Sequence, residues 1–183
     1  MTLAWAPALD RPDLLAEPVR LALEGLRQEG TETAGVDVGV IEVAEIDPDQ
    51  ADTAVLVEAT GWAMEDMANC IVIAGSRAGQ ERVCAALVLG HTRADVNTTI
   101  RKTLDVRKCS FMGMDDAVER TGMEYGGITP VGLPHDWPVL VDARVLDRDQ
   151  IVIGSGVRRS KLRLPGAMAA HLPGARVVDG LAV

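Results

Sequence analysis

The stretch Met123–Pro134 reads MEYGGITPVGLP and is the part of the chain that says most about its fold. Its two adjacent glycines, Gly126 and Gly127, let the backbone approach a ligand closely and take positive φ values. Two prolines stiffen the segment that follows, and Thr129 supplies a hydroxyl group beside the glycines. Such a loop can present backbone N–H groups to a carbonyl oxygen, as an oxyanion hole does. A plain tight turn needs the same residue types, so physical chemistry alone leaves both interpretations open.

The length of 183 residues fits one domain that buries its own core. Aromatic residues are scarce, with three Trp, one Tyr and one Phe, so the core is expected to consist of aliphatic side chains and Met. This scarcity also argues against a protein that binds single strands by stacking bases on rows of aromatic rings.

The first residues, MTLAWAPALDRPD, lack the basic and apolar segments of a secretory signal, and no apolar run is long enough to cross a membrane. Cys70, Cys84 and Cys109 are an odd number of cysteines in apolar surroundings, which predicts buried, reduced thiols. We therefore expect a cytoplasmic protein without membrane contact.

The formal net charge of −9 is unevenly distributed. Residues 1–68 carry a net charge of −12, and residues 69–183 carry +3. Two short stretches concentrate basic residues, among them Arg101, Lys102, Arg158, Arg159 and Lys161. They form either a solvated face or a local binding surface for phosphate groups.

Hydrophobic periodicity and turn residues predict an N-terminal helix–strand–helix segment. Its elements are a helix from Glu17-Pro18 to Gly30, a strand over Val36–Ile46, a helix over Gln50–Ala59 that Gly61 interrupts, and a helical turn over Met64–Ala68.

The rest of the chain mixes short strands and short helices without strict alternation, which favours an α+β fold. The predicted strands are Cys70–Ala74 and Arg82–Leu89 as a hairpin, Lys108–Phe111, Val139–Val141, Ile151–Ile153, Lys161–Leu164 and Arg176–Val178. The predicted helices run from about Thr92 to Leu104, over Asp115–Thr121 before Gly122, and over Gly166–His171.

No motif predicts a metal or a cofactor. His91, His135 and His171 are scattered and have no second ligand at metal-binding spacing. The run IVIGSG that ends at Gly156 leads from a strand into G-x-G, but Arg159 replaces the third glycine of a dinucleotide fingerprint.

From about Met64 to Val178, the order of features resembles the YbaK/prolyl-tRNA synthetase-associated family of aminoacyl-tRNA editing domains. The segment TGMEYGGITPVG is similar to the family signature T-G-x-x-x-G-G-[IV]-[ST]-P-x-G. The strand VLVDA, with Asp142, and the late glycine turn IGSG resemble later parts of the family pattern.

The resemblance implies a single α+β domain with a mixed, partly closed sheet or barrel flanked by helices. Residues 61–183 would form the editing domain, and residues 1–60 a helix–strand–helix extension of the same domain. The implied activity is hydrolysis, in trans, of the ester of mischarged aminoacyl-tRNA at its 3′ end, with no metal, cofactor or DNA.

The resemblance also assigns site residues. Gly126, Gly127 and Asn69 would be catalytic, and the aminoacyl group would lie against Ile128, Thr129, Pro130, Gly132, Asp142, Gly154, Ser155 and Gly156. The tRNA would contact Arg101, Lys102, Arg158, Arg159 and Lys161.

One position departs from the family pattern, because Asn69 occupies the place of a lysine at the start of the strand Cys70–Ala74. A neutral amide cannot replace an ammonium as a point charge, although it still donates and accepts hydrogen bonds. The alternative function is therefore a catalytically weak module that binds tRNA ends or small acyl compounds. A hydrolase of a non-tRNA ester is a third possibility.

Overall fold

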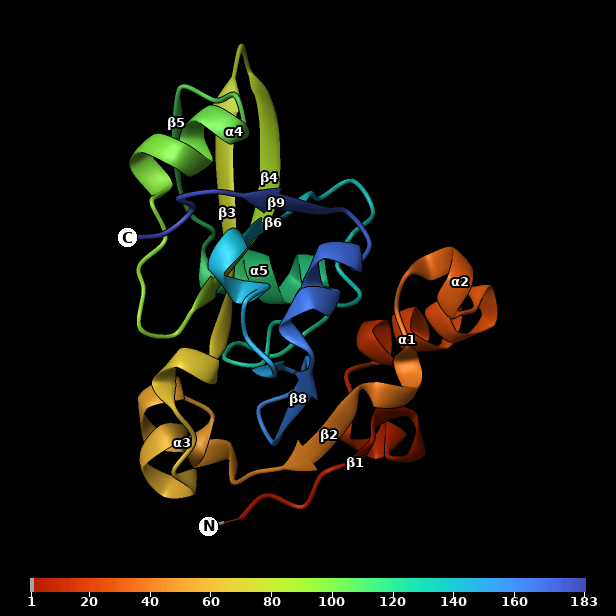
Figure 1. Cartoon of the computed structure of the whole chain (residues 1–183). Coiled ribbons are helices and arrows are strands. Elements are labelled where there is room, and N and C mark those ends of the chain that lie inside the picture. The colour runs from red at the N-terminus through yellow and green to blue at the C-terminus, as the bar shows by residue number, and fades with distance from the viewer. Residues whose placement is uncertain (1) are drawn as a thin grey trace.

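The computed structural model describes residues 2–183, which form two β-sheets flanked by helices (Figure 1). The first sheet has four antiparallel strands in the order β1 (Ala6–Pro7), β2 (Glu42–Glu45), β8 (Ser160–Leu164) and β7 (Ile151–Gly154). The second sheet has five strands in the order β5 (Lys108–Phe111), β3 (Ala68–Arg77), β4 (Gln80–Leu89), β6 (Val139–Asp142) and β9 (Ala175–Val178).

The second sheet is mixed, because β3 pairs antiparallel with β4 and β5, whereas β6 runs parallel to β4 and β9. A parallel bridge between Met67 and Val152 links the start of β3 to β7 of the first sheet. This bridge links the two sheets, and the predicted α+β fold is confirmed.

Helices flank the two sheets, with α1 and α2 on one side of the first sheet and α3 on the other (Figure 1). The helices are α1 (Glu17–Glu29), α2 (Thr31–Ala34), α3 (Thr53–Thr60), the π-helical turn η6 (Val96–Ile100), α4 (Arg101–Thr103) and α5 (Met114–Thr121). Short 3-10 turns are η1 (Ala8–Asp10), η2 (Pro12–Leu14), η3 (Val38–Val40), η4 (Pro48–Gln50), η5 (Met64–Asp66), η7 (Ala143–Val145) and η8 (Gly166–His171). No helix of the described chain is long and apolar enough to cross a bilayer.

The N-terminal segment is built into the first sheet. Strand β2 pairs along its whole length with β8, from Glu42 opposite Arg163 to Glu45 opposite Ser160. On α1, the buried residues Val19, Leu23 and Leu26 pack into the main hydrophobic core. The described part of this segment, residues 2–60, therefore shares a core with the rest of the chain.

Several predicted elements are found with nearly the expected bounds. Helix α1 begins beside Pro18 and ends at Gly30, which has a φ of 77°. Strands β3 and β4 form the predicted hairpin, and α5 ends at Gly122 with a φ of 66°. The residue after a helix often has a positive φ, which glycine adopts without strain because it lacks a Cβ atom. This preference explains why these bounds could be read from the sequence.

Two predicted elements of the N-terminal segment were wrong in part. Only Glu42–Glu45 of the strand Val36–Ile46 is extended, because the Asp37 carboxylate accepts a hydrogen bond from Gly39 N and turns the chain. The helix over Gln50–Ala59 begins only at Thr53, after the 3-10 turn η4. By contrast, the predicted short helix over Gly166–His171 is found with these bounds, as a 3-10 helix.

The helix predicted from Thr92 also begins late, at Val96. Asp95 accepts hydrogen bonds from the amides of Thr98 and Thr99 and caps a π-helical turn. The segment before it is held extended by the C-terminus, since Ala94 bridges to Ala182.

Candidate functional site

A cavity of about 470 Å³ lies where the two sheets meet. Its walls come from the N-terminal end of α3, the first half of β3, the glycine loop after α5, and strands β7 and β8. Its lining residues are Ala51, Asp52, Thr53, Leu56, Met67, Ala68, Asn69, Cys70, Ile71, Val72, Phe111, Met112, Ala117, Tyr125, Gly126, Ile128, Val152, Ile153, Gly154 and Lys161.

The glycine loop and the late glycine turn are tied together by their backbones. The amide of Gly156 donates to the carbonyl oxygen of Gly127 over 2.8 Å, and the amide of Glu124 donates to the carbonyl oxygen of Gly156 over 2.8 Å. Gly126, between them, has a φ of 83°, which glycine adopts without strain. The two segments therefore form one rigid edge of the cavity.

The amides that face the cavity differ in part from those expected. The N–H of Gly127 donates to the carbonyl oxygen of Glu124 over 2.9 Å, and Gly127 does not line the cavity. Gly126 and Ile128 do line it, and their N–H groups donate no hydrogen bond within residues 2–183. These two amides are therefore available as donors at residues that line the cavity.

Gly127 and Gly154 allow the loop and the turn to pack closely. A Cβ atom on Gly127 would lie 2.7 Å from the backbone of Val157. A Cβ atom on Gly154 would collide with the carbonyl oxygen of Gly127. Both residues shape the cavity edge through the absence of a side chain.

Asn69 is the second residue of β3 and lines the cavity, as predicted. Its Oδ1 accepts a hydrogen bond of 2.8 Å from the Thr53 hydroxyl at the start of α3. This bond leaves the side-chain N–H groups as donors. Thr53 was not predicted as a site residue, because sixteen residues and a helix separate it from Asn69.

Lys161 lies at the cavity, although the sequence grouped it with the basic residues for tRNA. The residue is only 8% exposed, and its Nζ donates a 2.8 Å hydrogen bond to the carbonyl oxygen of Ala51. Burial and, to a smaller extent, the positive charge of Arg158 lower the pKa of Lys161 to about 8, and Asp52 opposes the shift.

Cys70 is the thiol that lines the cavity. Burial raises the pKa of Cys70 to about 12, with a smaller contribution from Cys84. Because only a thiolate is a strong nucleophile, Cys70 is unreactive at neutral pH.

Other predicted residues support the cavity from behind. Thr129 and Ser155 are fully buried, and the Ser155 hydroxyl lies 2.7 Å from the Ser160 hydroxyl. A Cβ atom on Gly156 would collide with the Ala16 side chain. These residues are outside the cavity lining.

Pro130, Gly132 and Asp142 lie elsewhere. Pro130 and Gly132 line a separate depression beside α1, where Gly132 contacts the backbone of Pro18. Asp142 is 1% exposed and accepts hydrogen bonds from Arg144 and from the amide of Ala182. Asp142 is therefore outside the cavity lining, and its carboxylate holds the C-terminal segment through Ala182.

The predicted basic residues separate into two places. Arg158 lies at the cavity edge, where its guanidinium donates to the carbonyl oxygens of Tyr125 and Pro48. Arg159 is exposed on the same turn. Arg101 and Lys102 line a different depression on α4, together with residues that include Arg107.

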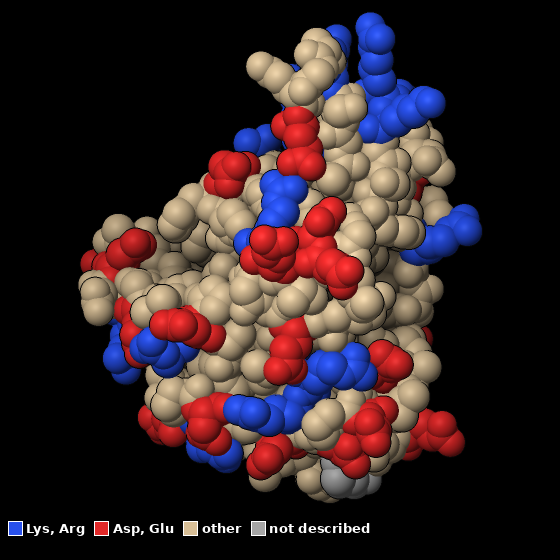
Figure 2. Space-filling view, turned by 180° about the vertical axis from the view of Figure 1, so that it is seen from behind, with Lys and Arg blue, Asp and Glu red and all other residues tan. Residues whose placement is uncertain are grey.

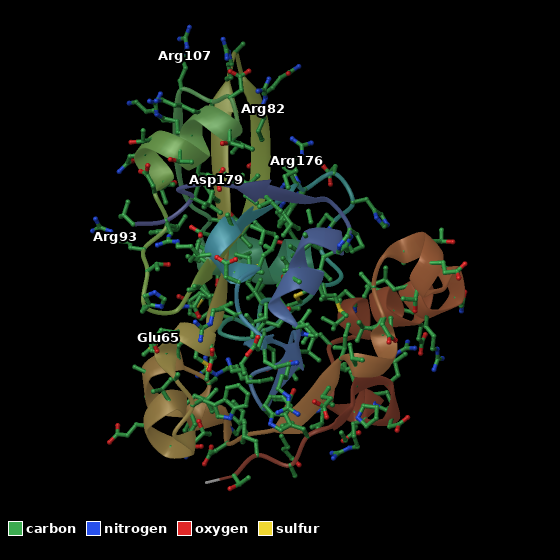
Figure 3. All side chains as sticks on the ribbon, viewed as in Figure 1. Glu65, Arg82, Arg93, Arg107, Arg176 and Asp179 are labelled. Atoms are coloured by element: carbon green, nitrogen blue, oxygen red, sulfur yellow. The ribbon has the colours of Figure 1, made fainter. Side chains whose placement is uncertain are left out.

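The region around α4 is the basic end of the molecule. Arg107 projects from it, and the guanidinium of Arg82 on β4 donates to the carbonyl oxygens of Leu104 and Asp105, near the end of the β3–β4 hairpin that is remote from α3 (Figure 3). Viewed from behind, basic side chains gather at this end, and acidic and basic side chains are mixed over the rest of this face (Figure 2).

Solved structures share this architecture. One was described as a proposed trans-editing enzyme for prolyl tRNA synthetase; it has a TM-score of 0.67, 22% identity, and the match covers 86% of this chain and 95% of that one. A second, a hypothetical protein, has a TM-score of 0.68, 21% identity and coverage of 84% and 97%. A scaffold protein from an epitope-grafting design has a TM-score of 0.69, 22% identity and coverage of 90% and 97%.

With sequence identities of 21–22%, these structures show that the chain has the same fold as they do, and they show nothing about its function. No curated protein matches the chain in sequence. The family model for the aminoacyl-tRNA editing domain matches residues 47–170, which include α3, the β3–β4 hairpin, the glycine loop and Lys161. Since this match spans more than half of the sequence, the chain belongs to the aminoacyl-tRNA editing domain family.

Proposed function

We propose that this protein hydrolyses the ester bond of mischarged aminoacyl-tRNA in trans. The observation that carries the proposal is the cavity, which is of aminoacyl size and has two unpaired backbone N–H groups, those of Gly126 and Ile128, at its edge. Membership of the editing domain family supports an aminoacyl-tRNA as the partner.

The chemistry needs no side-chain nucleophile. A water oxygen attacks the acyl carbonyl carbon, and the carbonyl π electrons move onto its oxygen, where the amides of Gly126 and Ile128 stabilise the charge. The carbonyl then re-forms, the bond to the ribose oxygen breaks, and this oxygen takes a proton from the attacking water through the neighbouring ribose hydroxyl. Burial keeps the thiol of Cys70 protonated, so it does not compete with water.

The walls of the cavity favour a small apolar amino acid. Leu56, Val72, Met112 and Ile153 line it together with a single acidic residue, Asp52, which is exposed. A cavity of this kind distinguishes substrates by about 1–3 kcal/mol per methylene group.

We assign the tRNA end to the side of the cavity that carries Arg158. A guanidinium pairs well with phosphate oxygens, and next to the half-buried Arg158 the exposed Arg159 adds a second cation on the same turn. Arg101 and Lys102 lie on α4 and would contact a more distant part of the tRNA.

The direct test is a deacylation screen. The protein would be incubated with several mischarged tRNAs, the matching correctly charged tRNAs, and the same aminoacyl groups as simple esters. We expect faster loss of the acyl group from at least one mischarged tRNA than from its simple ester. Loss at the buffer rate in every reaction would contradict the proposal, and equal rates for tRNA and simple ester would indicate a general esterase.

A second candidate, binding without turnover, is favoured by Asn69, a neutral residue held by Thr53. An adenosine whose 3′ position carries an amide-linked amino acid tests this function, since an amide resists hydrolysis. Saturable binding by a protein that deacylates nothing would establish a binding module. Turnover gained in Asn69→Lys, with Asn69→Ala as the matched control, would show that the missing charge is the reason.

A further inference from the structure

Lys161 is placed with its side chain on the cavity side of β8. It stands opposite Ala44 of β2 and Gly154 of β7. Its neighbours Leu162 and Ser160 are buried on the other face, where Leu162 belongs to the main core. Because side chains alternate along a strand, Lys161 extends towards the start of α3 and reaches Ala51.

The residues around Lys161 provide no structural reason for a charged ammonium group at this buried position. Its one hydrogen bond within residues 2–183 goes to a carbonyl oxygen, and no carboxylate of the described chain forms an ion pair with it. Nζ has three N–H groups, so two remain for a ligand. A buried cation without a countercharge destabilises a fold, so a purely structural role would be served better by an apolar side chain.

The charged groups around Lys161 compensate its charge only in part. Arg158 repels its charge and Asp52 attracts it, while Ala44 and Gly154 on the adjacent strands carry no charge. The pKa of about 8 that follows from burial keeps the group mostly protonated at neutral pH and allows it to lose the proton just above.

Of the described residues that line the cavity, Lys161 is the one with a basic side chain; the lining contains no other lysine and no arginine. The other donors there, the amides of Gly126 and Ile128 and the side chain of Asn69, are neutral. Negative charge that develops on an acyl oxygen in this cavity therefore finds its strongest partner in Lys161.

We propose that Lys161 is a catalytic residue of this cavity, whose ammonium donates a hydrogen bond to the acyl carbonyl oxygen and stabilises the negative charge formed when water attacks. The inference rests on the proposed ester hydrolysis. The ammonium keeps its proton throughout, since the proton released by the attacking water passes to the departing ribose oxygen. The charge on the acyl oxygen is lost when the carbonyl re-forms.

The test compares wild type with Lys161→Met, which keeps the length of the side chain and removes its charge. We expect kcat for deacylation to fall by about 10²–10³-fold with little change in KM, because the interaction is made in the transition state. Lys108→Met, an exposed lysine on β5, is the matched control and should keep wild-type kcat. An unchanged kcat in Lys161→Met, or a raised KM alone, would overturn the proposal.

The pH profile separates a catalytic charge from a structural one. After subtraction of the buffer rate, the wild-type rate should decline above about pH 8 as Lys161 loses its proton. The residual rate of Lys161→Met should lack this decline. A wild-type rate that keeps rising through pH 9 would contradict the catalytic role.

Unfolding is excluded as a cause by urea denaturation. Lys161→Met should be at least as stable as wild type at pH 7, because an uncompensated buried charge has been removed. The wild type should gain stability relative to this variant as the pH rises above about 8, since the unfolded chain then holds a proton that the folded chain has released. If wild type deacylates and Lys161→Met equals it, only the role of Lys161 fails; if wild type deacylates nothing, the proposed function fails with it.

Discussion

The amide of Gly156 donates a 2.8 Å hydrogen bond to the carbonyl oxygen of Gly127, twenty-nine positions earlier in the chain. This bond joins the late turn after β7 to the glycine loop after α5. Through it, the loop that carries the free amides of Gly126 and Ile128 is held against the strand pair that carries Lys161. The catalytic groups of the proposed reaction therefore depend on two glycine-rich segments that support each other.

Gly127→Ala should lower the free energy of unfolding by about 1–3 kcal/mol, because its Cβ would lie 2.7 Å from the backbone of Val157. Urea denaturation measures the change. Gly25→Ala, inside α1 with no atom within 4 Å of the new Cβ, is the control and should be neutral or stabilising by about 0.5–1 kcal/mol. Equal stability of the two variants would refute the close packing of loop and turn.

Arg158→Ala should raise KM for the mischarged tRNA and make the plot of log KM against log salt less steep by about one unit, as expected for one lost phosphate contact. Its guanidinium also holds the carbonyl oxygens of Tyr125 and Pro48, but loss of those bonds alone would not alter the salt dependence. The salt dependence of KM in Lys102→Ala tests in the same way whether α4 contacts the tRNA. An unchanged salt dependence in Arg158→Ala would remove this residue from the tRNA interface.

Cys70→Ala should leave kcat for deacylation close to the wild-type value. Burial raises the pKa of this thiol to about 12, so a thiolate is not available at neutral pH. Steady-state kinetics and mass spectrometry of the quenched reaction check the prediction. A large loss of kcat together with an acylated wild-type cysteine would show that the mechanism passes through a thioester.

Asp142→Asn should lower the free energy of unfolding at pH 7 by about 1.5–3 kcal/mol, since a buried charged acceptor is lost to Arg144 and Ala182. Burial opposes ionisation of Asp142, but hydrogen bonds from Arg144 and Ala182 outweigh it and hold the pKa of this carboxyl below its ordinary value. The stabilisation is therefore complete above the unfolded pKa of about 3.9 and disappears as the pH falls through the lower folded pKa.

Urea denaturation of wild type and Asp142→Asn at pH 7, 5 and 3 measures this loss. The difference between the two proteins should be constant between pH 7 and 5 and smaller at pH 3. Asp179→Asn, at an exposed position near the C-terminus, is the control. A difference that does not change with pH would mean that the charge of Asp142 is unimportant.

Local signals in the sequence were sufficient for the elements that end at glycine or turn at glycine. Gly30 and Gly122 end α1 and α5, and Gly79 lies in the β3–β4 hairpin, each with a positive φ. The late start of the helix at Val96 was not predictable, because the bridge from Ala94 to Ala182 joins segments that are far apart in the chain.

Part of the cavity lining comes from residues singled out in the sequence, while their chemical roles stay predictions. Gly126, Ile128 and Asn69 line the cavity as expected, and Gly154 does so from β7. The hydroxyl of Thr53 was missed, since no sequence pattern indicates that the start of α3 lies against β3.

The sequence by itself determined the family, the α+β fold and the glycine loop, because these depend on residues close together in the chain. Only the tertiary structure decided which groups meet in the cavity. It pairs the Gly127 amide with the carbonyl oxygen of Glu124, and it places the Lys161 ammonium beside the carbonyl oxygen of Ala51. The reason is that desolvation and pairing depend on distance in space. Lys161 belongs to a basic stretch of the sequence. It becomes a buried cation only because β8 pairs with β2 and β7, which places its side chain against the residues before α3.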